Sequence, residues 1–161
     1  MSAVFSECGL YRYQLERDVQ PEGIVFGFCG VNGSKAGVTV EDQTTLKWRG
    51  FTLRNGGRKY IAFSPFAYHA TDVRELARVP DPVGPLNGEY IRDSIARSDI
   101  LVPCWGNRAK VPKKLRGHFY DMLGLMLASG KPIKVFGLTK SGDPMHPLRL
   151  SYSTQLQDWK P

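Results

Sequence analysis

The chain has 161 residues, of which 42% are hydrophobic and 23% are charged, as in an ordinary globular protein. No apolar run reaches the length that crossing a bilayer needs, which excludes the class of membrane-spanning proteins. The formal net charge of +7 favours a polyanionic partner, although a solvated basic surface without a partner explains the charge about equally well.

The N-terminus lacks the basic and then apolar segment of a secretory signal. The three cysteines, Cys8, Cys29 and Cys104, are too scattered for a disulfide framework or a zinc site. His69 and His118 have no carboxylate or cysteine at the spacing of metal ligands. We therefore expect a cytoplasmic protein with no metal and no cofactor.

The first half of the chain predicts strands and helices in alternation. Residues 10–15 alternate tyrosine with polar side chains, which predicts a half-exposed strand. Residues 24–31 are apolar throughout and predict a strand covered on both faces. A helix is expected over residues 42–54, with Asp42 as its N-cap. Residues 59–63 predict a second buried strand, and residues 71–77 a short capped helix.

The second half repeats this alternation. Asn87 is expected to cap a helix, and residues 99–104 predict a third buried strand. The clearest helix is predicted over residues 112–129, where apolar side chains recur at helical spacing until Ser129-Gly130. Residues 134–138 predict a fourth buried strand, and the tail over residues 151–161 has no clear assignment.

Buried strands that alternate with helices predict one α/β domain over residues 1–161, built as a three-layer sandwich around a mostly parallel central sheet. The expected strands of this sheet are residues 25–31, 60–63, 99–102 and 134–138. In such sheets, ligands bind outside the carboxyl ends of the strands.

Polar and aromatic residues follow the predicted strands at that edge, and the loop over residues 137–148 adds a histidine. We expect one pocket, with His146 facing Asn32 across it, lined by Asn32, Ser34, Ser64, Phe66, Trp105, Asn107 and His146. Gly106 and Leu148 complete the candidate substrate-binding residues. Each residue alone has a plainer explanation: His146 as a turn residue, Asn32 as a left-handed turn position, and Trp105 as core.

Together these residues belong to a longer ordered pattern. It comprises Arg12-Tyr-x-Leu15-Glu16-Arg17, Asn32-x-Ser34, Asp42-x-Thr44, Phe66-Ala67, Ala70-Thr71, Pro82-Val-Gly-Pro85, Asn87, Trp105-Gly106 and Gly137-Leu-Thr-Lys-x-Gly-x-Pro-x-His146-Pro147-Leu148. The pattern resembles a domain-of-unknown-function family of bacteria and their phages, from about Tyr11 to Leu150. The sequence departs from that family at Gly33, where proline is usual, and at Ser64, where asparagine is usual.

The family pattern is in turn similar to the uracil-DNA glycosylase superfamily. There, a loop after an early strand carries an aspartate or asparagine that positions water, and a His-Pro-Ser-type loop holds the leaving base and wedges the duplex. Asn32 and His146-Pro147 match these two motifs, and Leu148 is the candidate wedge. The resemblance implies the fold of that superfamily, with Asn32 and His146 as catalytic residues.

The implied activity is that of a DNA N-glycosylase-like hydrolase, which cleaves the N-glycosidic bond of a flipped and modified base. A neutral histidine that donates to the departing base anion stabilises the developing charge. Phe66 and Trp105 are expected to line the base pocket.

DNA is the expected partner, because basic residues bunch near the predicted loops. The candidate contacts to the nucleic-acid backbone are Lys35, Arg108, Lys110, Lys113, Lys114 and Arg116. Two alternatives stay open. One is a non-catalytic module that binds nucleic acid or nucleotides on the same fold, which Gly33 and Ser64 favour; the other is an enzyme acting on free modified nucleotides.

Overall fold

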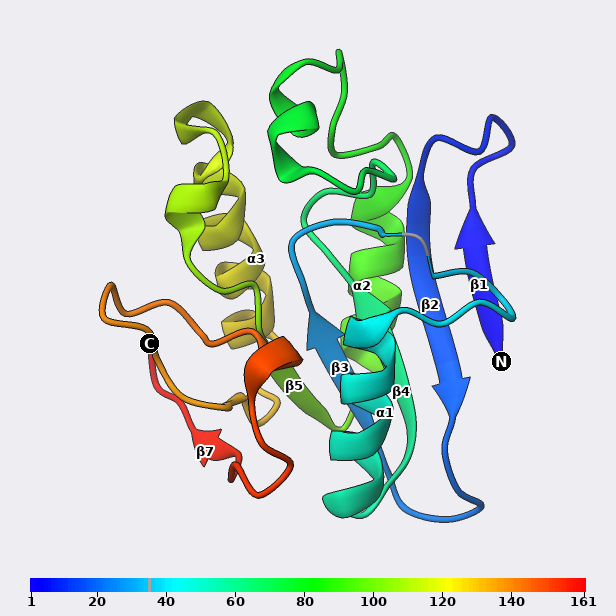
Figure 1. Cartoon of the computed structure of the whole chain (residues 1–161), viewed down its shortest axis with the longest axis vertical. Helices are drawn as coiled ribbons and strands as arrows, with labels where there is room; N and C mark the ends of the chain where they lie inside the picture. The colour runs from blue at the N-terminus through cyan, green and yellow to red at the C-terminus, as the bar shows by residue number, and fades with distance from the viewer. Residues whose placement is uncertain (35) are drawn as a thin grey trace.

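The computed structural model describes residues 1–34 and 36–161 and has a mixed α/β architecture (Figure 1). The strands found in these residues are β1 (Ser2–Phe5), β2 (Arg12–Asp18), β3 (Ile24–Cys29), β4 (Gly57–Phe63), β5 (Ile100–Pro103), β6 (Lys134–Val135) and β7 (Gln157–Asp158). The α-helices found there are α1 (Gln43–Arg54), α2 (Asn87–Arg97) and α3 (Gly117–Ala128). Short 3₁₀ helices are η1 (Val73–Ala77), η2 (Arg108–Lys110), η3 (Lys113–Leu115) and η4 (Pro147–Arg149).

Strands β1 to β5 form one mixed sheet in the order β1-β2-β4-β3-β5. Strand β3 pairs in parallel with both β4 and β5, whereas β2 pairs antiparallel with both β1 and β4. The prediction of a mostly parallel sheet is therefore wrong. The difference comes from β1 and β2: residues 6–11 are too short for a crossover, so these two strands form an antiparallel hairpin, and β2 also lies antiparallel to β4.

The prediction that residues 134–138 form a strand of the main sheet is also wrong. The ordered part of this segment, β6, covers Lys134–Val135 and pairs antiparallel with β7 in a separate small sheet. Its link to the main sheet is a parallel bridge between Ile133 and Leu101. Gly137 adopts a φ of 141°, which turns the chain out of the strand direction after Phe136.

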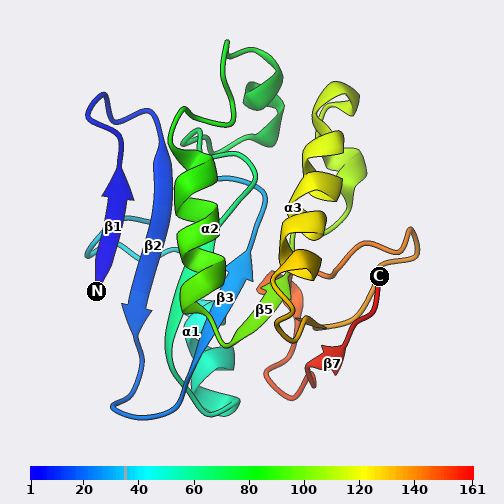
Figure 2. The same cartoon turned by 180° about the vertical axis from the view of Figure 1, so that it is seen from behind.

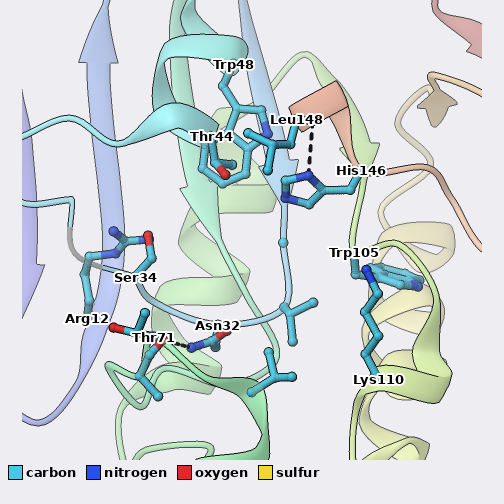
Figure 3. A pocket seen from close by; sticks show the side chains of 14 residues that line it. Arg12, Asn32, Ser34, Thr44, Trp48, Thr71, Trp105, Lys110, His146 and Leu148 are labelled. Carbon is cyan, nitrogen blue, oxygen red and sulfur yellow. Dashed lines mark hydrogen bonds between the residues drawn. The ribbon is translucent and has the colours of Figure 1, made fainter. Parts of the chain in front are cut away.

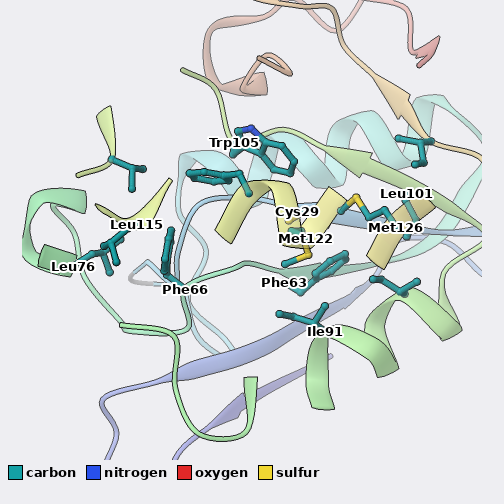
Figure 4. Close-up of a cluster of buried hydrophobic side chains, with 14 residues drawn as sticks. Cys29, Phe63, Phe66, Leu76, Ile91, Leu101, Trp105, Leu115, Met122 and Met126 are labelled. Carbon is teal, nitrogen blue, oxygen red and sulfur yellow. The ribbon is translucent and has the colours of Figure 1, made fainter. Parts of the chain in front are cut away.

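Helix α1 covers one face of the sheet, and α2 and α3 cover the other (Figures 1 and 2). Neighbouring residues of a strand point to opposite faces, and β3 shows this directly. Phe28 packs with Trp48 of α1 in one hydrophobic cluster. Cys29 packs with Ile95 of α2 and Met126 of α3 in the other cluster (Figure 4). The core is therefore divided between the two faces of the sheet.

Helix α1 begins where the sequence predicts it. The Asp42 carboxylate accepts a hydrogen bond from the Thr45 backbone N–H at 2.9 Å, and the Thr45 hydroxyl accepts one from the Asp42 N–H at 2.9 Å. This reciprocal capping box fixes the first turn of the helix. The cap matters for the site, because it holds Thr44 and Trp48 at the carboxyl edge of the parallel strands.

Candidate functional site

The carboxyl ends of β3 and β5 lie at a topological switch point of the sheet, where successive chain connections run to opposite sides of β3. Strand β4 lies on one side of β3 and β5 on the other, which is the position where open α/β sheets bind ligands. A cavity of about 320 Å³ lies at this position (Figure 3). Its lining residues are Arg12, Gly30, Val31, Asn32, Ser34, Thr44, Trp48, Ala70, Thr71, Val73, Trp105, Lys110, His146 and Leu148.

His146 is presented by the loop between β6 and η4. The backbone N–H of Gly106 donates to the Pro144 carbonyl at 2.8 Å, which fastens this loop to the end of β5. His146 is the N-cap of η4, and its Nδ1 accepts a hydrogen bond from the Leu148 N–H at 3.2 Å. Because Nδ1 accepts, the neutral imidazole carries its proton on Nε2. Nε2 has no hydrogen-bond partner in the part of the chain that the structure describes, so it is free to donate to a ligand.

The electrostatic surroundings keep His146 neutral. Burial lowers the pKa of this imidazole, and the positive charge of Lys110 lowers it further, while the Asp42 carboxylate opposes the shift. A neutral Nε2–H donor is therefore the state of His146 at physiological pH.

Asn32 lies across the cavity from His146 (Figure 3). Its side-chain N–H₂ donates to the carbonyl of Gly33 at 2.8 Å and to the carbonyl of Ala70 at 2.7 Å. Both donors of the amide are thus used by backbone, and the amide oxygen of this lining residue is left as an acceptor. The two carbonyls also explain why an amide suits this position, since a carboxylate would place an oxygen against them.

Ser34 and Asp42 form a second polar group beside Asn32. The Ser34 hydroxyl donates to the Asp42 carboxylate, so the Ser34 oxygen keeps only acceptor capacity for a ligand. Burial acts to raise the pKa of Asp42, but hydrogen bonds from Ser34 and Thr45 and the charge of Arg12 outweigh it, and the pKa is lowered. Asp42 is therefore an ionised, structurally engaged carboxylate.

Two cations reach the cavity. Arg12 is 7% exposed, and its Nη1 donates to the Ala36 carbonyl at 2.8 Å. Burial lowers the pKa of Arg12 to about 10, which leaves the guanidinium charged at neutral pH. Lys110 enters from η2 on the side of His146. Trp48 and Trp105, each 5% exposed, supply the large apolar walls.

The structure brings together Asn32, Ser34, Trp105, His146 and Leu148 of the predicted site residues. It places four others outside the cavity lining: Ser64, Phe66, Gly106 and Asn107.

Each of these four has a structural position that explains the difference. The Ser64 hydroxyl donates to the Phe66 carbonyl at 2.9 Å. Phe66 is 0% exposed because Phe119 of α3 packs edge-on against its ring, so stacking on a ligand is not its role. Gly106 is buried in the backbone turn after β5, with a φ of 73°. Asn107 is exposed and caps η2.

The predicted contacts to a nucleic-acid backbone also divide. Lys110 and Lys113 are exposed, and in the described chain no carboxylate lies within ion-pair distance of either. Arg108 pairs with Asp143 and lies over the Tyr120 ring. Lys114 donates to the Ala77 carbonyl, and Arg116 donates to the carbonyls of Val111 and Ala109. Lys35 lies outside the described residues.

Sequence reasoning did not assign Arg12, Thr44, Trp48 and Thr71 to the site. Three of them, Arg12, Thr44 and Thr71, do occur in the ordered pattern that carries the family resemblance, and that pattern was the available signal. Trp48 had no such signal, because its place on α1 follows from how the helix packs on β3.

Among the described residues, no group of three or more His, Cys, Asp or Glu side chains is arranged to hold a metal ion. None of the described helices combines the length and the hydrophobicity that crossing a membrane requires.

The fold and the cavity define a mixed α/β protein with a ligand-sized site at the topological switch point of its sheet. The chain belongs to the family described as "Protein of unknown function (DUF1643)", which matches residues 12–148. The resemblance to a domain-of-unknown-function family is thereby confirmed. No curated protein and no solved structure gives a significant match.

Proposed function

We propose that this protein processes DNA bases by hydrolysing the N-glycosidic bond of a flipped, modified base. The proposal extends the similarity between its Asn32 and His146-Pro147 motifs and those of the uracil-DNA glycosylase superfamily. The placement of helices on both faces of the sheet supports the corresponding three-layer fold (Figures 1 and 2). The observation that carries the proposal is the neutral Nε2–H donor of His146, opposite the amide oxygen of Asn32 in one cavity.

The chemistry assigns each group one task. The bond between C1′ of the sugar and the base nitrogen breaks, and the base leaves with the bonding electrons as an anion. His146 donates through Nε2–H to an oxygen of that anion and so stabilises the transition state. The amide oxygen of Asn32 accepts a hydrogen bond from the water that attacks C1′ and orients it. One proton of that water passes to solvent, and the base anion takes up a proton from solvent.

This arrangement predicts slow or selective hydrolysis. Asn32 orients water but has no basic atom to deprotonate it. Asp42, whose carboxylate accepts from the lining residue Ser34, has a lowered pKa and is also engaged by Thr45, which makes it a weak base. Much of the rate therefore has to come from stabilising the leaving base.

The test is incubation of the protein with single- and double-stranded oligonucleotides that carry assorted modified bases, followed by alkaline cleavage at abasic sites. We expect strand breaks at one class of modified base, and a strong loss of this activity in Asn32→Ala. Asn55→Ala is the matched control, because its amide also donates to a backbone carbonyl but lies at the far end of α1.

Binding without any base release would favour the non-catalytic module on the same fold. Activity on free modified nucleotides alone would favour the nucleotide enzyme. Absence of both binding and base release across the whole set would refute the proposal.

A further inference from the structure

We propose that the end of the cavity formed by Arg12 binds a phosphate group, so that the site takes a nucleotide unit with its phosphate rather than a bare base or nucleoside. The nucleotide part of this inference rests on the proposed function, whereas the phosphate part rests on Arg12 and its surroundings. The phosphate comes either from a free 5′-nucleotide or from the phosphodiester of a DNA strand.

The first observation is that Arg12 is buried with little compensation for its charge. A guanidinium has five N–H groups, and in the described chain the side chain of Arg12 makes one hydrogen bond, to the Ala36 carbonyl. The charge of the Asp42 carboxylate acts on Arg12, but no carboxylate of the described residues lies within ion-pair distance of its guanidinium. Burying a cation is unfavourable unless the cation is paired. An anion in the cavity would supply the missing partner.

Arg17, five residues later on the same strand, shows the contrast. It is 1% exposed, and its guanidinium is paired with Glu41 and donates to the carbonyls of Glu16 and Gly37. The chain thus pairs one buried arginine of β2 with a carboxylate, although the Nε of Arg17 makes no hydrogen bond within the described residues, and places the other at a cavity. Arg12 lines that cavity, and none of its nitrogen atoms is among the fully buried side-chain atoms that lack a hydrogen bond in the described chain.

The second observation is the N-terminus of α1, which has 12 residues and reaches the same cavity through Thr44. The backbone N–H groups of Gln43 and Thr44 have no acceptor in the part of the chain that the structure describes. A helix N-terminus favours anions through these free N–H groups and its dipole. The Asp42 carboxylate offsets part of this field, but it already accepts from Ser34 and Thr45.

The arrangement gives the ligand a direction. Arg12 and Ser34 lie at one end of the cavity and His146 at the other, and Asn32 lines the side across from His146 (Figure 3). A nucleotide with its phosphate on Arg12 and its base on His146 places the sugar next to Asn32. This is where the orientation of water is needed.

The experiment follows the tryptophan fluorescence of the protein, because Trp48 and Trp105 both line the cavity. The probes are the four standard deoxynucleoside 5′-monophosphates, their deoxynucleosides, and deoxyribose 5-phosphate against deoxyribose as a pair without a base. We expect each phosphorylated probe to bind about tenfold or more tightly than its partner, as a charge-assisted hydrogen bond implies. Inorganic phosphate is expected to compete.

Arg12→Gln is expected to bring the affinity ratio to about one, and Arg12→Lys to restore part of it. Arg58→Gln is the control, because this exposed arginine lies at the amino end of β4, away from the cavity. If Arg12→Gln fails to fold, Arg12→Lys and the wild-type probe pairs still decide the question. A short single-stranded oligonucleotide identifies the source of the phosphate by competing with the monophosphates or failing to.

Equal affinity for the members of each pair, or no binding of any probe, would overturn the inference. A clear preference for phosphate that survives Arg12→Gln unchanged would also overturn it. A preference that depends on Arg12, without base release from any DNA, would leave the phosphate site standing and refute the proposed hydrolysis.

Discussion

Removing the two unpaired lysines near the cavity should change how DNA affinity depends on salt. Lys110 lines the cavity, and Lys113 is exposed at the start of η3. The proposed change is Lys110→Gln together with Lys113→Gln. Each phosphate contact contributes about 0.9 to the slope of log affinity against log salt for duplex DNA. Losing two contacts should therefore flatten the slope by about 1.8.

That change in slope has a direct consequence for measured affinities. Between roughly 50 and 200 mM salt, the factor by which affinity falls should be about twelve times smaller for the double variant than for the wild type. For single-stranded DNA the flattening should be about 1.4, because each contact contributes about 0.7. The loss should be alike for all sequences, since contacts to phosphate do not read bases.

The assay is fluorescence anisotropy of labelled oligonucleotides across that salt range. Lys140→Gln with Lys160→Gln is the matched control, because it removes the same charge from exposed positions outside the cavity lining. Lys114 and Arg116 are left unchanged, since their donors already hold backbone carbonyls and their loss would disturb η3. A wild-type affinity that does not change with salt concentration would refute this interpretation of the basic residues. A control variant whose salt slope is flattened by the same amount would also refute it.

Three further outcomes are expected. The pKa of His146 is lowered in the folded state, so the free energy of unfolding should fall as pH drops below about 6.5. The fall should be at most about 1.4 kcal/mol per pH unit, and denaturant titrations of His146→Gln should lack it. In thermal unfolding, Gly27→Ala should destabilise the fold by about 1–3 kcal/mol, since its Cβ would lie 2.5 Å from the Ser98 hydroxyl oxygen. The control Gly124→Ala on α3 meets no atom within 4 Å and should be neutral or stabilising. Asn32→Asp should cost about 1–3 kcal/mol because it leaves two backbone carbonyls without donors, and an unchanged melting temperature would contradict this.

Local sequence signals were sufficient for the elements whose cause is local. The Asp42 cap and the helix after it follow from side-chain chemistry within four residues. The strands at β3, β4 and β5 follow from apolar runs long enough to be covered on both faces. The position of Asn32 at the cavity follows from the direction of the parallel strands, whereas His146 reaches it because the Gly106 N–H holds the Pro144 carbonyl of its loop.

Strand β2 shows where a local pattern is insufficient. Its alternation of polar and apolar residues predicts half exposure, yet Arg12, Gln14 and Glu16 are all buried. Gln14 donates to the Asp93 carboxylate and the Ser94 hydroxyl of α2, and Glu16 pairs with cations of neighbouring elements. Sequence patterns predict such polar residues to be exposed, because the partners that allow their burial come from distant segments and are brought near only by the tertiary fold.

Phe66 and Trp48 show the same limit in the site itself. Phe66 follows β4 at the carboxyl edge where the cavity lies, but α3 packs against its ring, so Phe66 is buried in the core and does not line the cavity. Trp48 lies in the second turn of α1 and reaches the cavity because the helix lies across Phe28. The position of a side chain relative to a cavity depends on how helices pack on the sheet, and no periodicity within one segment reports that.

The most direct test of the account is the rate of base release under single turnover, with DNA affinity measured in parallel. On the modified oligonucleotide that the wild type cleaves, His146→Ala should lower the rate on the order of a hundredfold or more and leave affinity nearly unchanged. His118→Ala, a histidine outside the cavity lining, should keep the wild-type rate. Equal rates for the wild type and His146→Ala, or a loss explained wholly by weaker binding, would contradict the assignment of His146 to the departing base.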